Sequence, residues 1–340
     1  MLAVLWKSGE DDSINTERTY TMCSQSYRGG LPLTIINPNV HIKCQEPGTC
    51  VLEGGANQLV NLDTAVVAAS PRDGYDSSNL FVEGMVFRGA SDTPVALGGP
   101  GLNMTLKDCT WTSQDATNPP RSGVNLFRNF GENITDDGGI YNSLGIQNGT
   151  FDDNVFRYAA IEVGDDNSPG SPSHQLIVED TIFTNNIIQN EACDACDNDT
   201  LAEYYSAVMS LEFAIVTMTK VKIQDNIIAQ ARAAIVVVNS DFVFEESSMT
   251  VSGNAIGEAL GGECKDVAMV SLDDDGPNEV CTEFQDITTA APVVVASANP
   301  GPTTDPTSAP SEPNPSSDES SANSWSVGMV GMMSMLFCFF

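Results

Sequence analysis

One block of residues returns six times between residues 80 and 254. It reads apolar, any residue, apolar, then four residues and a large apolar residue; four copies carry Asn three positions later. The large apolar positions, which lie 24 to 40 residues apart, are Phe87, Trp111, Phe151, Phe183, Ile223 and Val251. One such unit cannot bury its own apolar face, so the units must stack on one another. The chain is therefore predicted to fold as a solenoid.

The blocks have the two-residue apolar period of a β-strand and lack the 3.6-residue period of a helix. Between them lie segments rich in Gly, Asn, Asp, Ser and Pro, which are typical of turns. This combination favours an all-β, single-stranded parallel β-helix over a propeller or a sandwich. In the last copy, taken as Phe244 to Val251, Glu246 stands where the other copies are apolar. Either the strand register slips there or a loop begins.

Four asparagines follow the last four large apolar residues at the same spacing: Asn154, Asn186, Asn226 and Asn254. A turn that recurs in every coil can stack Asn amides so that each donates to the oxygen of the next. Asn also tolerates the left-handed backbone of a tight turn. These residues are therefore predicted to form a structural ladder in preference to a ligand site.

The net charge of the chain excludes nucleic acid as a partner. Only 14 Lys and Arg stand against 46 Asp and Glu, giving a formal net charge of −32, whereas binding to phosphates requires clustered basic residues. An acidic surface of this kind suits solubility in a saline medium or attraction of divalent cations, and the first explanation is favoured.

Three segments are expected along the chain: the β-helix over residues 18–285, a Ser/Thr/Pro-rich stalk over 286–324 and an apolar tail over 325–340. The stalk composition cannot pack a core and is typical of disordered, O-glycosylated segments. Small residues, a polar spacer and an uncharged apolar tail match the signal for a glycosylphosphatidylinositol (GPI) anchor, with a short membrane anchor as the alternative. Either one attaches the protein to a membrane. Met1 to Trp6 is too short for a signal peptide, so either the true start lies upstream or the tail is not an anchor signal; the sequons and cysteines favour a start upstream.

Sequons and cysteines indicate a secretory route, with the protein at the extracellular face of the plasma membrane or in the cell wall. The Asn-x-Ser/Thr sequons, predicted glycosylation sites, are Asn103, Asn133, Asn148 and Asn198. Eight cysteines precede the stalk, an even number that fits disulfides in an oxidising compartment. The predicted pairs are Cys44–Cys50 and Cys264–Cys281. The Cys193-x-x-Cys196 motif is interpreted as a loop staple, since a zinc or redox site would need partners that its acidic loop lacks.

Candidate catalytic residues are sparse, and no cofactor is expected unless calcium binds. Glycoside hydrolysis needs paired carboxylates, and Asp152 and Asp153 are the best-placed candidates. A structural role in a turn, with a side chain hydrogen-bonded to the backbone, is the favoured interpretation of both residues. Elimination needs a base, for which Arg157 and Lys222 are candidates, with Lys220 and Lys222 predicted to alternate on one strand face. His41 is expected in an early strand and His174 in a loop, neither with a catalytic partner. Asp273, Asp274 and Asp275 are the candidates for a weak calcium site, although they lack EF-hand spacing.

Three segments carry a family resemblance: Ile36 to Gly55 (INPNVHIKCQEPGTCVLEGG), Asn79 to Ala90 (NLFVEGMVFRGA) and Val178 to Asn186 (VEDTIFTNN). Over about residues 18–285 the chain resembles the pectin-lyase-like superfamily of right-handed parallel β-helix proteins, in particular its divergent secreted members of microalgal type. The resemblance implies the scaffold. It does not supply an activity, because the Gly-His-Gly and Arg-Ile-Lys elements of the polygalacturonase-like pattern are missing, and the calcium aspartates and catalytic Arg of pectate lyases cannot be placed.

These observations favour a non-catalytic, membrane-anchored cell-surface glycoprotein that acts in adhesion, wall organisation or binding of an extracellular polysaccharide. The alternatives are a polysaccharide lyase or glycoside hydrolase acting on acidic polysaccharides, and a coat protein without a ligand. Carboxylates converging beside Arg157, Lys222 or Arg232 in a groove would favour the enzyme. A face without such a cluster would favour binding or structure.

Overall fold

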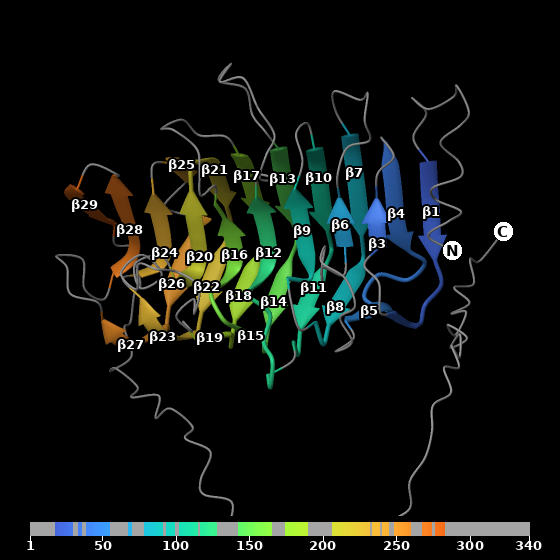
Figure 1. Ribbon diagram of the computed structural model, residues 1–340, viewed down its shortest axis with the longest axis horizontal. Coiled ribbons are helices and arrows are strands. Elements are labelled where there is room, and N and C mark those ends of the chain that lie inside the picture. Colours follow the sequence, from blue (N-terminus) through green and yellow to red (C-terminus); the bar gives the residue numbers. More distant parts are fainter. Residues whose placement is uncertain are drawn as a thin grey trace, which may run out of the picture.

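The computed structural model describes residues 18–29, 33–35, 39–54, 67–69, 78–90, 93–98, 102–114, 116–127, 142–164, 174–189, 206–231, 233–238, 240–244, 248–259, 267–273 and 276–282. Within these ranges the chain forms strands β1 to β29 and no α-helix. Strands distant in sequence lie side by side, in coils that follow one another along the long axis of the molecule (Figure 1). The predicted parallel β-helix is confirmed.

Sheets A and B each take one strand from each of eight coils. Sheet A contains β1 (Arg18–Met22), β4 (Val40–Cys44), β7 (Ser78–Glu83), β10 (Leu102–Lys107), β13 (Asn142–Gln147), β17 (His174–Glu179), β21 (Ala214–Thr219) and β25 (Asp241–Phe244). Sheet B contains β2 (Ser26–Gly29), β5 (Cys50–Gly54), β8 (Met85–Arg88), β11 (Thr110–Thr112), β14 (Thr150–Asp152), β18 (Ile182–Thr184), β22 (Lys222–Gln224) and β26 (Thr250–Ser252).

Sheet C closes each coil, and a short sheet D lies between B and C in the chain order of the last four coils. Sheet C contains β3 (Leu33–Ile35), β6 (Val67–Ala69), β9 (Val95–Gly98), β12 (Ser122–Phe127), β16 (Ala159–Val163), β20 (Ala207–Glu212), β24 (Ala233–Val238), β28 (Val267–Asp273) and β29 (Gly276–Thr282). Sheet D contains β15 (Val155–Phe156), β19 (Ile187–Ile188), β23 (Ile227–Ala231) and β27 (Ala255–Ala259). Of the described strand pairs, β28 with β29 is antiparallel and the rest are parallel.

The large apolar residue of the repeat forms a buried stack inside sheet B. The ring centroids of Phe87 and Trp111 lie 5.0 Å apart, those of Trp111 and Phe151 4.1 Å, and those of Phe151 and Phe183 4.6 Å. Ile223 and Val251 continue the column in register. Like residues therefore pack on like residues from coil to coil, and the aromatic contacts add to the area they bury.

The predicted asparagine column forms a buried hydrogen-bond ladder after sheet B. The Nδ2 atom of Asn154 donates to Asn186 Oδ1 at 2.8 Å, Asn186 donates to Asn226 at 2.9 Å, and Asn226 donates to Asn254 at 2.8 Å. Each backbone N–H of the first three also donates to the next amide oxygen. The ladder thus satisfies polar groups that would otherwise be buried without partners.

A second column joins sheets A and B through left-handed residues, with positive φ at Gly84, Asp108, Asn148, Asp180 and Lys220. Gly, Asn and Asp tolerate this conformation, and Lys220, with a φ of 55°, does so beside Asp180, whose carboxylate lies 3.4 Å from its Nζ. Lys220 therefore belongs to a turn, whereas Lys222 lies in β22. The prediction that both alternate on one strand face is wrong.

The last copy of the repeat is offset from its predicted alignment. Phe242 pairs with Val216 and Phe244 with Met218, so the apolar pair of this coil is Phe242 and Phe244. Val251 then pairs with Ile223, which makes the connection two residues longer than in the preceding coil. The described strands of this coil thus stay in register with the preceding coil, and Glu246 itself lies outside the described residues.

The Cys44–Cys50 disulfide is confirmed, with the two Cα atoms 5.6 Å apart. It closes the inserted turn between β4 and β5. Cys23 is also disulfide-bonded. Cys109, which was not among the predicted pairs, is a free, buried thiol. Cys193, Cys196 and Cys264 lie outside the described residues, as does the side chain of Cys281.

Candidate functional site

The outer face of sheet A carries three rows of side chains on neighbouring strands. The amide row is Asn39, Asn79 and Asn103. The ring row, named after its two ring-bearing members, is His41, Phe81 and Thr105. The charged row is Lys43, Glu83 and Lys107. Strand pairing aligns Asn79 with Asn103, Phe81 with His41 and Thr105, and Glu83 with Lys43 and Lys107. Because side chains alternate along a strand, all three rows point away from the core.

The amide row and the ring row line a hollow of about 600 Å³ on β4, β7 and β10. We call it the sheet A hollow. Its lining comprises Asn39, Val40, His41, Asn79, Leu80, Phe81, Asn103 and Thr105. A concave surface that combines apolar surface with a few aligned polar groups is the usual form of a small-ligand site.

The amide row is held in one orientation by its own hydrogen bonds. Asn79 Nδ2 donates to Asn39 Oδ1 at 2.9 Å, and Asn103 Nδ2 donates to Asn79 Oδ1 at 3.3 Å. A primary amide has two N–H donors and two oxygen lone pairs, so each side chain retains capacity for a ligand beyond these bonds. Unlike the buried ladder, the row is exposed to solvent: Asn79 and Asn103 are both exposed residues.

The ring row supplies apolar surface beside these amides. His41 and Phe81 meet edge to face, with centroids 4.6 Å apart and ring planes at 88°. Both side chains are half-buried, so part of their surface still faces the hollow. Their contact fixes the orientation of the phenyl ring without covering it.

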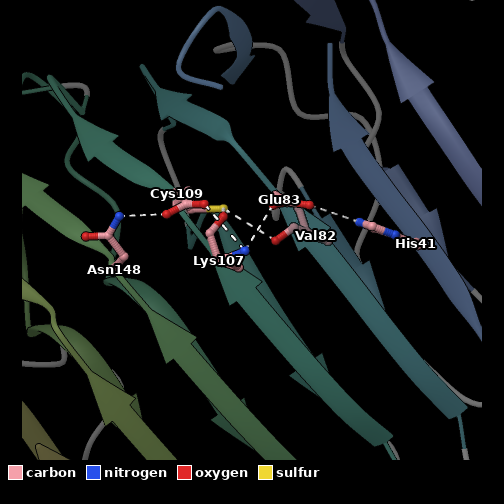
Figure 2. A network of polar contacts seen from close by, with 7 residues as sticks. His41, Val82, Glu83, Lys107, Cys109 and Asn148 are labelled. Atoms are coloured by element: carbon pink, nitrogen blue, oxygen red, sulfur yellow. Dashed lines mark hydrogen bonds and ion pairs between the residues drawn. The ribbon is translucent and has the colours of Figure 1, made fainter. Parts of the chain in front are cut away.

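Glu83 and Lys107 of the charged row belong to a network of polar contacts, which Figure 2 shows. Glu83 lies between two partners, with Oε2 3.3 Å from His41 Nε2 and Oε1 3.3 Å from Lys107 Nζ. Lys107 Nζ is also 3.9 Å from Asp108 Oδ2, and Asn148 Nδ2 donates to Asp108 Oδ1 at 2.6 Å. This network runs across four coils and does not include Lys43, the other cation of the charged row.

The catalytic candidates from the sequence are not assembled by the fold. Asp152 ends β14 and accepts a hydrogen bond from Asn185 Nδ2 at 3.0 Å, and Asp153 is an exposed turn residue with a φ of 55°. Lys222 is exposed on sheet B, two strands from β14. Arg157 lies at the corner before sheet C, where its Nε is buried with no hydrogen-bond partner. None of the four lines the sheet A hollow.

A separate polar cluster, which the sequence did not indicate, lies on sheet C. Arg121 Nε donates to both carboxylate oxygens of Glu162, at 2.8 and 3.0 Å, and Arg121 Nη2 donates to Oε1 at 2.6 Å. The guanidinium carbon lies 4.9 Å from the ring centroid of Tyr158. Burial, and secondarily the Glu162 charge, raises the pKa of the Tyr158 hydroxyl far above its usual range. The Glu162 side chain is only 9% exposed. A shielded carboxylate with both oxygens engaged suits structure better than acid–base chemistry.

One of the two histidines lies where the sequence predicts it and the other does not. His41 lies in β4 as expected, but His174 is the first residue of β17 and is fully buried, so its prediction as a loop residue is wrong. Its Nδ1 lies 2.5 Å from Asn142 Oδ1 inside the coil. The described residues contain no group of three or more His, Cys, Asp or Glu arranged to hold a metal ion. Asp274 and Asp275 lie outside the described residues, as does the side chain of Asp273.

Two of the predicted glycosylation sites lie on the described surface. Asn103 is exposed on β10, and Asn148 is exposed in the turn before β14. Asn133 and Asn198 lie outside the described residues, together with Arg232 and residues 286–340. Within the part of the chain that is described, no helix is long and apolar enough to cross a membrane.

The residues of the hollow had a signal in the sequence that the repeat analysis missed. In three successive coils an Asn directly precedes the apolar-x-apolar block: Asn39-Val-His-Ile, Asn79-Leu-Phe-Val and Asn103-Met-Thr-Leu. Attention to the outward positions of aligned strands would have placed these amides in one row.

No protein-family model and no curated protein matches this chain. Among solved structures it is similar to the A-module of mannuronan C-5 epimerase from Azotobacter vinelandii, with 12% sequence identity, a TM-score of 0.21, and coverage of 85% of this chain and 94% of that chain. A likeness at this level carries no argument about the site. The site is therefore judged on its own geometry, and membership of the pectin-lyase-like superfamily stays a proposal.

Proposed function

We propose that this chain is a non-catalytic carbohydrate-binding protein whose sheet A hollow is the binding site. The observation that carries the proposal is the amide row lying beside the ring row in one concavity. A sugar ring presents C–H faces, which pack on aromatic surface, and hydroxyls, which both donate to and accept from amides. The hollow offers both kinds of contact in neighbouring rows.

The rows also suit an extended chain of sugars. Each row advances by one strand per coil, which is a spacing of about 4.8 Å along the solenoid axis. A polysaccharide lying along that axis would present hydroxyls to successive amides of the row. The hollow is therefore proposed to bind an internal stretch of a polysaccharide.

Charge favours a neutral polysaccharide over an acidic one. The net charge of −32 repels polyanions at a distance. Close to the hollow, Lys107 is paired with Glu83 and Asp108, so it is not a free anchor for a uronate, and Lys43 is the cation of the charged row that lies outside this network. The lyase or hydrolase alternative needs carboxylates converging on the hollow, and Glu83, the carboxylate nearest the ring row, is already engaged by His41 and Lys107.

The cellular setting belongs to the same proposal. A secreted glycoprotein, held at the cell surface either by a GPI anchor that replaces residues 325–340 or by those residues as a membrane anchor, and spaced from the membrane by the stalk at 286–324, would present the β-helix to wall polysaccharide. The sequons, the confirmed disulfide and the tail composition support this setting. Calcium, attracted by the acidic surface, is a proposed accessory and not a cofactor of the hollow.

The test is a binding screen of the full chain against neutral and acidic polysaccharides. Turnover is followed in the same samples by the ultraviolet absorbance of unsaturated uronates, which a lyase produces, and by the release of reducing ends. We expect binding of a neutral glycan without turnover. The Phe81→Ala variant should weaken binding about tenfold, which corresponds to about 1.4 kcal/mol. Ile177→Ala is the matched control, because Ile177 occupies the same outward row of sheet A on β17, outside the hollow. Turnover, or equal losses in the two variants, would contradict the proposal.

A further inference from the structure

Asn103 belongs both to the hollow and to a glycosylation sequon. The sequon is Asn103-Met104-Thr105, and Asn103 and Thr105 both line the hollow. Met104 between them is buried in the core, which fixes the outward direction of the other two. Asn103 Nδ2, the atom that would carry a glycan, lies 3.3 Å from Asn79 Oδ1 and so at the amide row itself.

Asn148 offers the natural comparison. It is also an exposed sequon residue, but it lies in the turn before β14, with a φ of 52°. Its Nδ2 donates to Asp108 Oδ1, and it is not part of the lining of the hollow. A glycan at Asn148 would therefore start outside the hollow.

We propose that N-glycosylation of Asn103 fills the sheet A hollow with the first sugar of the chain's own glycan and closes it to other ligands. This proposal rests on the hollow being a carbohydrate site. In the reaction, a lipid-linked sugar diphosphate is the donor: the bond from the anomeric carbon to Nδ2 forms, the bond to the diphosphate oxygen breaks, and the amide nitrogen loses one proton. The other N–H remains, so the bond to Asn79 Oδ1 can persist.

The first sugar would meet the contacts that an external ligand uses. The Nδ2 atom of Asn103 is one covalent bond from the sugar ring. Phe81 and Asn79, on the adjacent strand, line the same hollow. A tethered sugar has a high effective concentration at its own site, so it outcompetes free polysaccharide without needing high intrinsic affinity. Two forms of the protein follow: one glycosylated at Asn103 and closed, the other unmodified and open.

The experiment uses the full chain carrying a secretion signal and expressed in a eukaryotic host, and it measures glycan release by an amidase at each sequon by mass spectrometry. In the native protein we expect release at Asn103 to be about tenfold slower than at Asn148, because the sugar is packed in the hollow, and equal rates after denaturation. Phe81→Ala should speed release at Asn103 and leave Asn148 unchanged.

Polysaccharide binding is measured on the same material. The chain made in a host that does not glycosylate should bind the polysaccharide, whereas the chain fully glycosylated at Asn103 should not. Asn148→Gln should leave binding unchanged. An unmodified Asn103, equal release at the two sites, or full occupancy of Asn103 without loss of binding would overturn the proposal. Slow release at Asn103 together with no polysaccharide binding by the unglycosylated chain would support the filling of the hollow and overturn the proposed function instead.

Discussion

Replacement of Asn186 by Ala should destabilise the β-helix strongly, because Asn186 lies in the middle of the buried ladder. Its Nδ2 donates to Phe151 O and to Asn226 Oδ1, both at 2.9 Å. Its Oδ1 accepts from the backbone N of Asn154 at 3.3 Å and from Asn154 Nδ2 at 2.8 Å. The residue has no exposed surface, so water cannot replace these partners.

The magnitude follows from the number of groups left without partners. A buried donor or acceptor that loses its partner costs about 1 kcal/mol or more, so the loss of these bonds should lower the free energy of unfolding by about 3–4 kcal/mol. Asn79→Ala removes hydrogen bonds of the same chemistry from the exposed amide row. There water replaces the lost partners, and the cost should stay within about 0.5 kcal/mol.

Urea unfolding of the full chain, followed by far-ultraviolet circular dichroism, compares the two variants. The midpoint for Asn186→Ala should fall by about 1 M or more, since several kcal/mol are divided by a slope of a few kcal/mol per molar. The midpoint for Asn79→Ala should barely move. A fall for Asn186→Ala no larger than that for Asn79→Ala would refute the argument that the ladder stabilises the stack by burying satisfied amides.

Four further substitutions test other parts of the structure. Arg121→Ala leaves the Glu162 carboxylate, with a side chain only 9% exposed, without its cation, and should cost about 2–3 kcal/mol of unfolding free energy by the same urea assay. Gly123→Ala places a Cβ 2.8 Å from the Ala160 carbonyl oxygen and 3.1 Å from the rings of Phe151 and Phe156, and should cost about 1–3 kcal/mol, whereas Gly145→Ala meets nothing closer than 3.6 Å and should be tolerated. Burial raises the pKa of the Cys109 thiol from 9.0 to about 12. Native Cys109 should therefore resist alkylation at pH 8 while the unfolded chain reacts. Because the unfolded thiol ionises first, its contribution to stability is present below pH 9 and is lost between pH 9 and about 12, a decline that Cys109→Val should reduce.

The scaffold was predictable because its determinants are periodic along the chain. The aromatic stack and the ladder both come from one spacing, from Phe151 to Asn154 and from Phe183 to Asn186, that survives loops of any length. The first two coils lie outside the six copies of the repeat. In the second coil, Val40 and Ile42 are separated from Leu52 by the inserted turn that the Cys44–Cys50 disulfide closes, although strand pairing aligns Leu52 with Phe87. An insertion changes the sequence spacing between two residues without changing the positions at which they pair in the sheets.

The hollow and the sheet C cluster were harder to foresee because they depend on pairs across coils. Arg121 and Glu162 are 41 residues apart, and His41 and Glu83 are 42 residues apart. Only the strand register brings each pair together, and the register depends on loop lengths that a single sequence does not reveal. Of the acidic residues that the sequence does emphasise, Asp152 ends β14 and Asp153 occupies the turn that follows, for which Asp is suited by its backbone preferences.

The most direct measurement of the central claim is a crystal structure of the unglycosylated chain with a bound oligosaccharide from the polysaccharide that binds best in the screen. The proposed function predicts a sugar ring packed on Phe81, with hydroxyls hydrogen-bonded to Asn79 and Asn103, and with the oligosaccharide running along the solenoid axis over β4, β7 and β10. An oligosaccharide bound elsewhere on the molecule, with the sheet A hollow holding only solvent, would contradict it.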